Sequence, residues 1–113
     1  MTHNEKINDA GEMHTIHMDG ITTYIIYTNE GFFRGGKKYF ADKVFRVLSW
    51  EVQFIYEKNG FDIYETLSSA DGDKNIPTGV AHIFKSLTNS VILEYFPEGT
   101  QSEDFERYRQ WKK

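Results

Sequence analysis

Short segments rich in β-branched and aromatic residues, separated by glycine, asparagine and aspartate, fill most of this 113-residue chain. Ile21 to Thr28 is the clearest of these segments, and Asn29-Glu30-Gly31 supplies a turn behind it. Asn59-Gly60 is a strong hairpin signal, because both central residues of a type I′ turn need a positive φ angle. Several short strands at close spacing predict a small antiparallel β-sandwich or barrel.

The other predicted strands follow the same pattern. They are expected within Lys43–Tyr56, with a break near Ser49-Trp50, and at Phe61–Leu67, Ile83–Leu87 and Ser90–Phe96.

The two ends of the chain depart from this pattern. The first residues are polar and without periodicity, which predicts a flexible N-terminal arm over residues 1–12, ahead of a single domain over residues 13–113. Near the other end, Phe105, Tyr108 and Trp111 lie three apart, which predicts a short helix whose apolar stripe docks on the sheets. Ser102 is placed to cap that helix through its hydroxyl.

The composition argues against several classes of protein. The chain has no cysteine, which excludes disulfides and cysteine metal sites. No run of apolar residues approaches the length of a membrane span, so a soluble and cytoplasmic protein is expected. A net charge of −4 gives no reason to expect a nucleic-acid partner.

Two segments carry the strongest motif signal. Pro77-Thr78-Gly79-Val80-Ala81-His82 resembles the second signature of the cupin superfamily, Pro-x-Gly-x-x-His. Arg34-Gly35-Gly36 leads the segment where the first signature belongs. In cupins, a His-x-His pair and a following Glu of that first signature join the second-signature histidine around a metal. In this chain the pair falls on Lys37 and Tyr39, and the Glu falls on Lys43.

The resemblance runs from Gly31 to Arg109 and implies an all-β cupin double-stranded β-helix, or jelly roll, with a short C-terminal helix and a pocket in the barrel mouth. Through His82-Ile83-Phe84 and Val91 to Phe96, the chain resembles small stand-alone cupins of bacterial surface-sugar gene clusters. It is more distantly similar to sugar-nucleotide ketoisomerases. The resemblance implies a role in polysaccharide biosynthesis and a homodimer, with Ile21 to Tyr27 as the candidate edge strand.

Metal binding is not expected from these residues, and no cofactor is expected. A cupin site needs several neutral or anionic donors around one ion, whereas a lysine ammonium repels a divalent cation. His82 is the one expected ligand that survives. The alternative is a divalent-metal site rebuilt with His14 or His17.

A pocket for a small anionic ligand of carbohydrate type is the function that these replacements favour. Alternate residues of a strand share a face, so Lys43 in the Glu position would point into the barrel near His82. Arg34 and Lys37 would join Lys43 in a cationic mouth suited to carboxylate or phosphate. Flat apolar walls are expected from Tyr39, Tyr56 and Phe84.

The catalytic alternative is a metal-independent sugar-nucleotide isomerase or epimerase. His82 would serve as the acid or base, because its reference pKa is close to neutrality, with Tyr39 as its partner. However, the two histidine positions that the ketoisomerase resemblance would make catalytic hold Lys37 and Tyr39. Whether the chain is an enzyme is therefore left open by the sequence.

Overall fold

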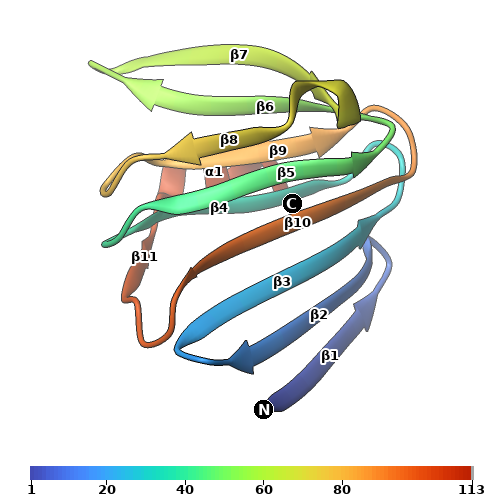
Figure 1. Cartoon of the computed structure of the whole chain (residues 1–113). Coiled ribbons are helices and arrows are strands. Elements are labelled where there is room, and N and C mark those ends of the chain that lie inside the picture. The colour runs from blue at the N-terminus through green and yellow to red at the C-terminus, as the bar shows by residue number, and fades with distance from the viewer. Residues whose placement is uncertain (113) are drawn as a thin grey trace.

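The computed structural model describes residues 1–112, which form two antiparallel β-sheets and a short C-terminal helix (Figure 1). The first strands are β1 (Thr2–Asn8), β2 (Gly11–Met18), β3 (Ile21–Thr28), β4 (Phe33–Tyr39), β5 (Lys43–Ser49) and β6 (Glu51–Lys58). The later elements are β7 (Phe61–Ser68), η1 (Ser69–Asp71), β8 (Asp73–Ile76), β9 (His82–Ser86), β10 (Ser90–Pro97), β11 (Ser102–Asp104), α1 (Glu106–Arg109) and η2 (Gln110–Lys112).

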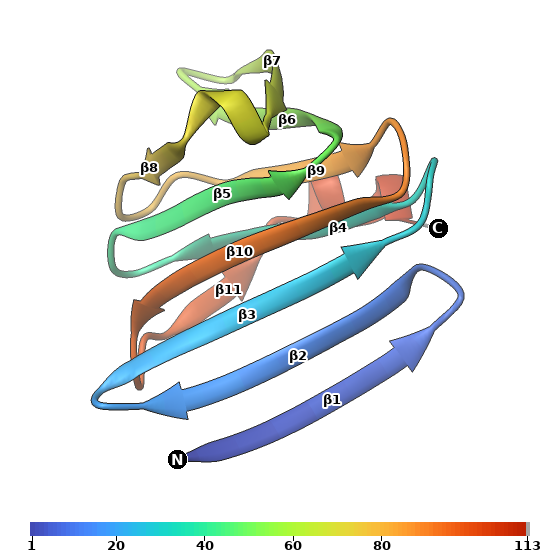
Figure 2. The ribbon, with the colours of Figure 1, turned by 45° about the vertical axis from the view of Figure 1, so that its right-hand side comes forward.

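The chain crosses repeatedly between the two sheets, as a jelly roll requires. One sheet has the strand order β1-β2-β3-β10-β5-β8, and the other has the order β11-β4-β9-β6-β7. From β3 onward, most connections lead from one sheet to the other, so β4 and β9 lie in one sheet while β5 and β10 lie in the other. Figure 2 shows β1 and β2 extending the first sheet beyond β3. The expected all-β jelly roll is confirmed.

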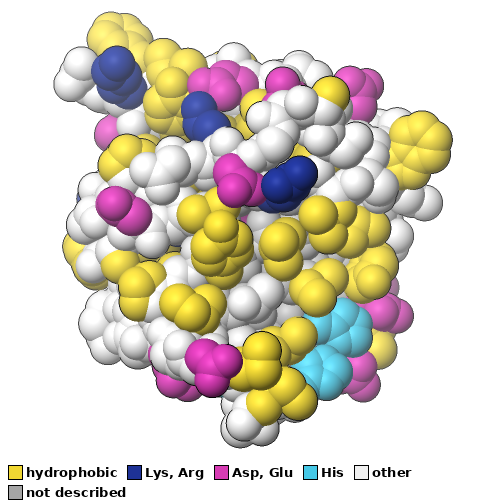
Figure 3. Space-filling view, in the orientation of Figure 1, with side chains coloured by type: hydrophobic (Ala, Val, Ile, Leu, Met, Phe, Trp, Pro, Cys, Tyr) yellow, Lys and Arg dark blue, Asp and Glu magenta, His cyan; other side chains and the backbone are white. Residues whose placement is uncertain are grey.

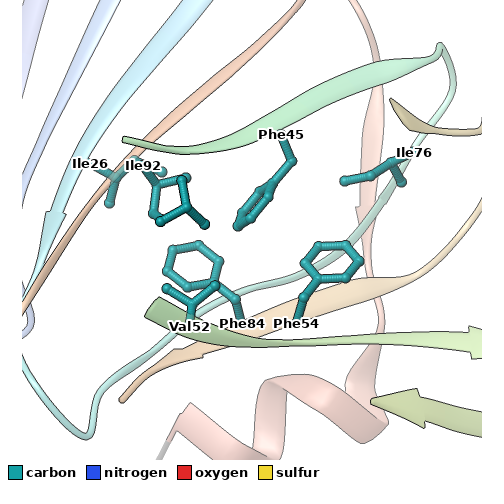
Figure 4. Packing of buried hydrophobic residues seen from close by; sticks show 8 residues of the cluster. Ile26, Phe45, Val52, Phe54, Ile76, Phe84 and Ile92 are labelled. Atoms are coloured by element: carbon teal, nitrogen blue, oxygen red, sulfur yellow. The ribbon is translucent and has the colours of Figure 1, made fainter. Parts of the chain in front are cut away.

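The core lies between the two sheets, where alternate side chains of each strand point inward. Three phenylalanines, Phe45, Phe54 and Phe84, meet there across the sheets, with ring centroids 4.9 Å apart for Phe45–Phe54 and 5.3 Å apart for Phe45–Phe84 (Figure 4). Ile26 and Ile92 fill the space beside them. The aromatic content noted in the sequence is therefore largely core packing.

The strand and turn signals are confirmed. β3 has the predicted limits, and β6 and β7 are joined at Asn59-Gly60, whose φ angles are 53° and 83°. The break between β5 and β6 falls at Trp50, which has a φ angle of 67°. At Asn59-Gly60 these angles reverse the chain within two residues, so β6 and β7 pair directly. Trp50 lies where the chain passes from β5 in one sheet to β6 in the other.

The N-terminal residues differ from the expected flexible arm. Thr2 to Asn8 form β1, which pairs with β2 in an antiparallel hairpin closed by Asn8, whose side-chain oxygen accepts from the backbone N–H of Ala10 at 2.9 Å. All seven residues of β1 are exposed. A strand with neither face covered shows no alternation of apolar and polar residues, which explains why the sequence pattern missed it.

The β2 strand also corrects the prediction that Ile21 to Tyr27 forms a sheet edge. β3 lies between β2 and β10 and is hydrogen-bonded on both sides, so it is an interior strand. Within residues 1–112, the first sheet ends at β1 on one side and at β8 on the other.

The C-terminal segment packs on the outer face of the second sheet. Phe105, Tyr108 and Trp111 join Ile55 and Ile83 in a second apolar cluster, which confirms the predicted stripe. The cap was placed wrongly: Ser102 belongs to β11, which pairs with β4, and the helix starts only after Phe105. Phe105 stands at the N-cap position without a side-chain cap bond, and its backbone N–H donates to the carbonyl oxygen of Gly36 at 2.9 Å. In the described part of the chain, no helix combines the length and the apolar character that crossing a membrane needs.

Candidate functional site

The two signature segments lie side by side, on paired strands of one sheet. β4 pairs with β9, and Lys37 stands opposite His82 in the register. The loop that carries the second signature is tied to the first, because the Gly79 backbone N–H donates to the carbonyl oxygen of Tyr39 at 2.8 Å. The Thr78 backbone N–H donates to the Asp42 carboxylate at 2.9 Å. This adjacency is the one that the cupin resemblance implies.

A bulge in β4 shapes the site. The register with β9 shifts between Gly35 and Lys37, and Gly35 and Gly36 have φ angles of 103° and 86°, where other residues are strained. A Cβ on Gly36 would lie 3.0 Å from Cδ of Arg109 and 3.4 Å from its backbone nitrogen. Gly36 thus allows the C-terminal segment to approach the strand that carries Lys37 and Tyr39, whereas a Cβ on Gly35 would lie 3.3 Å from the carbonyl oxygen of His82 on β9.

The central feature is a buried trio of Lys43, His82 and Glu94. Lys43 is only 3 % exposed, and its Nζ lies 2.9 Å from Oε1 of Glu94 and 3.0 Å from Nε2 of His82. Lys43 points into the barrel near His82, as the strand periodicity predicted. Glu94 was not predicted. Its signal in the sequence is a charged residue at an inward position of β10, between Ile92 and Phe96.

The protonation states in the trio follow from its geometry. Nδ1 of His82 lies 3.0 Å from the carbonyl oxygen of Val80, which can only accept, so Nδ1 carries the proton. Nε2 then accepts a hydrogen bond from the Lys43 ammonium. Burial, together with the charge of Lys43, lowers the pKa of His82 to about 3, so its ring is neutral at neutral pH. Burial also lowers the pKa of Lys43, and the Glu94 carboxylate opposes that shift.

Tyr39 closes the trio on one side. The Lys43 ammonium lies 4.1 Å from the centre of the Tyr39 ring, a cation–π contact, and the ring centroids of Tyr39 and His82 are 5.9 Å apart. Burial and the nearby Glu94 carboxylate raise the pKa of Tyr39 well above its usual range. The phenol is therefore un-ionised at neutral pH.

The described residues do not fit the metal that the cupin fold implies. Two donors, His82 and Glu94, converge on one point, but the Lys43 ammonium fills that point at hydrogen-bond distances. Across residues 1–112, no three histidine, aspartate or glutamate side chains come together as a metal site would need. The alternative ligands lie on β2, where His14 contacts His3 at 3.0 Å and His17 contacts Thr22 at 2.8 Å.

A cavity of about 380 Å³ opens between the sheets beside the trio. We call it the mouth cavity, and its lining is Lys6, Met13, Tyr24, Ile26, Arg34, Gly35, Lys37, Tyr39, Lys43, Phe84, Glu94, Ser102, Arg109 and Lys112. Of the predicted ligand-binding and catalytic residues, five belong to this lining: Arg34, Lys37, Tyr39, Lys43 and Phe84. Six of the lining side chains are cationic and one is a carboxylate. The cavity is therefore strongly electropositive although the whole chain carries a net charge of −4.

Arg34 lies deep in the wall of this cavity. The side chain comes from β4, and the residue is 9 % exposed. Its Nε donates to the Thr28 hydroxyl at 3.4 Å, whereas its Nη2 is buried without a hydrogen-bond partner among the described residues. Lys37, in contrast, is partly exposed and lies 3.5 Å from the Asp104 carboxylate, to which Arg109 is also close, at 3.9 Å. The expected cationic mouth thus contains cations that are paired with a carboxylate, such as Lys37, and a cation without such a partner in residues 1–112, Arg34.

The predicted aromatic walls divide between two sides of the core. Tyr39 and Phe84 line the mouth cavity. Tyr56 lines a separate hollow of about 360 Å³, where the Lys74 ammonium lies 5.1 Å from its ring centre. Tyr56 is paired with His82 in the β6–β9 register. Its side chain nevertheless lines the other hollow, so the structure does not bring it into the mouth cavity with the other predicted site residues.

Comparisons with known proteins support the fold. No protein-family model matches the chain, and no curated protein matches it. Among solved structures, the capsular polysaccharide assembling protein CapF from Staphylococcus aureus matches with a TM-score of 0.68 and 15 % identity, over 84 % of this chain and 28 % of CapF. A deletion mutant of Bacillus subtilis oxalate decarboxylase matches with a TM-score of 0.80 and 8 % identity, over 95 % of this chain and 31 % of that chain.

The chain thus spans less than a third of the length of each of these two proteins. At such low identities the likeness concerns the fold. The strand order, the adjacent signature segments and the structural matches agree with one another. This chain has the cupin fold, with a buried Lys43–Glu94 ion pair beside His82.

Proposed function

We propose that this chain binds a small anionic ligand of carbohydrate type in the mouth cavity, without a metal. The observation that carries the proposal is the cavity itself, which has the size of small-molecule sites, about 300–1,000 Å³, and combines aromatic walls with an excess of cationic side chains. Tyr24 and Tyr39 offer flat surfaces of the kind that stack on sugar rings.

The likeness to CapF supports the link to carbohydrates, because that protein is described as assembling capsular polysaccharide. The cationic lining supports an anionic ligand, since arginine and lysine recognise carboxylate and phosphate groups. The position of the Lys43 ammonium supports metal-independent binding, because this cation fills the point on which His82 and Glu94 converge.

Binding without turnover is the form of the proposal that the geometry favours. An isomerase would need His82 to accept and return a proton. Both of its ring nitrogens are engaged, by Lys43 and by Val80, and the residue is 2 % exposed. Tyr39, as its expected partner, holds its proton tightly. The trio therefore supports the shape of the cavity, and the proposal assigns it no chemical step.

The test is a binding screen with glucose 1-phosphate, glucuronate and glucose, measured by thermal shift and then by calorimetry. We expect the anionic sugars to raise the melting temperature more than glucose does, and a chelator to leave their affinities unchanged. Carbonyl migration in a keto-sugar nucleotide, followed by NMR, should not occur. Binding that a chelator abolishes, or migration that His82→Gln removes, would contradict the proposal.

We also propose a homodimer, formed through the outer face of the first sheet instead of the edge expected from sequence. Figure 3 shows hydrophobic side chains gathered on this face. Tyr27 and Leu48 are 46 % and 44 % exposed there, and a contiguous exposed apolar patch marks an interaction site. Light scattering at micromolar concentration should give twice the chain mass for the wild type. The double variant Tyr27→Lys and Leu48→Lys should give the mass of a single chain.

A cytoplasmic location stays a prediction, and cell fractionation checks it.

A further inference from the structure

The unpaired guanidinium of Arg34 points to a missing partner. An arginine side chain is charged at all ordinary pH values, and a buried donor without an acceptor is unfavourable, most of all when it belongs to a charged group. Arg34 has a single hydrogen bond, a long one to Thr28, and its Nη2 is buried with no acceptor in the described residues. Burial lowers the pKa of Arg34, which is the sign of a cation taken out of water without compensation.

Two further cations from distant parts of the chain belong to the same cavity wall as this guanidinium. Lys6 comes from β1 and Lys112 from η2, and both line the mouth cavity together with Arg34. The same three residues also line a neighbouring hollow of about 620 Å³, so Arg34 lies where the two spaces meet. Asp9 is the acidic residue of that second hollow.

The three cations differ from the others that line the cavity. Lys43 is paired with Glu94, while Lys37 and Arg109 share Asp104. Lys6, Arg34 and Lys112 have no ion pair with any carboxylate of the described residues. We call these three side chains the open cation cluster.

The members of the open cation cluster influence one another. Desolvation and the charges of Arg109, Arg34 and Lys6 lower the pKa of Lys112 to about 8. Its ammonium has a hydrogen bond to the Gly35 carbonyl oxygen at 3.2 Å, which fixes it over the β4 bulge. Because these cations repel one another, a bound anion would stabilise their charged forms.

We propose that Lys6, Arg34 and Lys112 form a subsite for the phosphate group of a phosphorylated small molecule. A phosphate monoester has close to two negative charges at neutral pH and three strong acceptor oxygens, which suits three cations from three separate elements. A carboxylate offers one charge and two oxygens. The inference rests on the proposed function, since it places the phosphate at Arg34 and the remainder of the ligand beside Tyr39 in the mouth cavity.

Calorimetric titration of the whole chain with glucose 1-phosphate, inorganic phosphate, glucuronate and glucose tests this subsite. We expect glucose 1-phosphate to bind at least about ten-fold more tightly than glucuronate. Arg34→Gln should weaken glucose 1-phosphate on the order of 100-fold, because it removes the buried partner. Lys6→Gln and Lys112→Gln should each weaken it about ten-fold. Glucose should bind equally to all of these proteins.

The matched control is Lys38→Gln, which removes a lysine of the same β4 strand whose ammonium lies 3.5 Å from Glu103 and does not line the cavity. It should leave every affinity unchanged. Arg34→Gln removes a buried side chain, so its fold is checked by the amide NMR spectrum. The combined Lys6→Gln and Lys112→Gln variant, whose changes lie at exposed positions, carries the test if Arg34→Gln does not fold.

Proton uptake gives an independent measurement. A bound dianion stabilises the protonated form of Lys112, so its pKa rises from about 8. Titration at pH 8 in two buffers of different ionisation enthalpy should therefore show uptake of a fraction of a proton by the wild-type protein. Lys112→Gln should abolish this uptake.

The outcomes separate the subsite from the proposed function. If glucuronate and glucose bind but phosphate adds no affinity, or if the three variants bind glucose 1-phosphate as the wild type does, the subsite is wrong and the proposed function stands. If inorganic phosphate binds through the open cation cluster and the sugar adds nothing, the subsite stands and the carbohydrate ligand is wrong. If no compound binds, both are overturned.

Discussion

The Lys43 trio and the open cation cluster both place positive charge on the mouth cavity, yet their surroundings are opposite. Lys43 has a carboxylate at 2.9 Å, an imidazole nitrogen at 3.0 Å and an aromatic face at 4.1 Å, so its buried charge is compensated within the chain. The guanidinium of Arg34 is also buried, but it has one long hydrogen bond and two cationic neighbours.

The contrast separates a structural charge from a binding charge. A buried cation whose partners come from the same chain contributes to the folded state and is not available to a ligand. A buried cation without such partners is unfavourable until something from outside compensates it. The residue type does not decide this role, and neither does burial alone; the pairing decides it.

The largest expected effect comes from converting the first centre into a metal site. Lys37→His, Tyr39→His and Lys43→Glu together should give His82 three new partner ligands, because all three positions line the same cavity. Calorimetry with zinc or nickel should show a dissociation constant of about 1 μM or tighter, equivalent to about 8 kcal/mol. Lys38→His is the matched control and should bind no metal. A folded triple variant without metal affinity would show that these positions do not correspond to cupin ligands.

Removing the ammonium alone should produce the next largest effect. Lys43→Met leaves the Glu94 carboxylate buried without a cation, so we expect a loss of about 3–5 kcal/mol in the free energy of unfolding. Urea denaturation measures it. Adding Glu94→Gln should restore much of the loss, because the unpaired charge is then gone. Equal stability of the wild type and the single variant would mean that the pair is not buried in solution.

The low pKa of His82 predicts a pH dependence of stability. The unfolded chain binds a proton at His82 below about pH 6.5, whereas the folded chain resists it down to about pH 3. The unfolded state therefore binds more protons in that window, and stability falls as the pH falls, by about 1.4 kcal/mol for each unit below pH 6. His82→Gln should flatten the dependence between pH 6 and 5, measured by urea denaturation at each pH. An unchanged slope would mean that His82 is accessible to protons.

The smallest effect is expected on the outer side of β4. Lys38 pairs with Glu103 at 3.5 Å in an exposed position, and such pairs contribute little. Lys38→Gln should change the free energy of unfolding by less than about 0.5 kcal/mol in urea denaturation. A loss as large as that of Lys43→Met would remove the distinction between the buried Lys43–Glu94 pair and the Lys38–Glu103 pair.

Local patterns predicted most of the fold, because strand alternation and turn residues act within a few positions. Ile21 to Thr28 and the Asn59-Gly60 turn are confirmed in place. The edge assignment of β3 failed because β2 pairs with it, and neither β2, which has no fully buried residue, nor the exposed β1 leaves an alternating apolar pattern. The Ser102 cap failed because β11 pairs with a strand more than sixty residues earlier, which no local signal reports.

The candidate site was predictable where a signature fixes the register, and not elsewhere. The position of Lys43 beside His82 followed from the signature and the strand period. Glu94 was readable in principle, as a charged residue at an inward position of β10. Lys6 and Lys112 reach the cavity only through the pairing of β1 and the docking of the C-terminal segment, so their roles depend on long-range contacts.

The β4 bulge determines how closely the C-terminal segment packs on β4. Gly36 leaves just enough room for Arg109, and Gly35 offers its carbonyl oxygen to Lys112, so the last turn of the chain is seated directly on the strand that carries Arg34. A side chain at position 36 would push that turn away and carry Lys112 with it. Because Gly36 has no Cβ, the bulge sets the spacing between Arg34 and Lys112, two charged residues that lie 78 positions apart in the sequence.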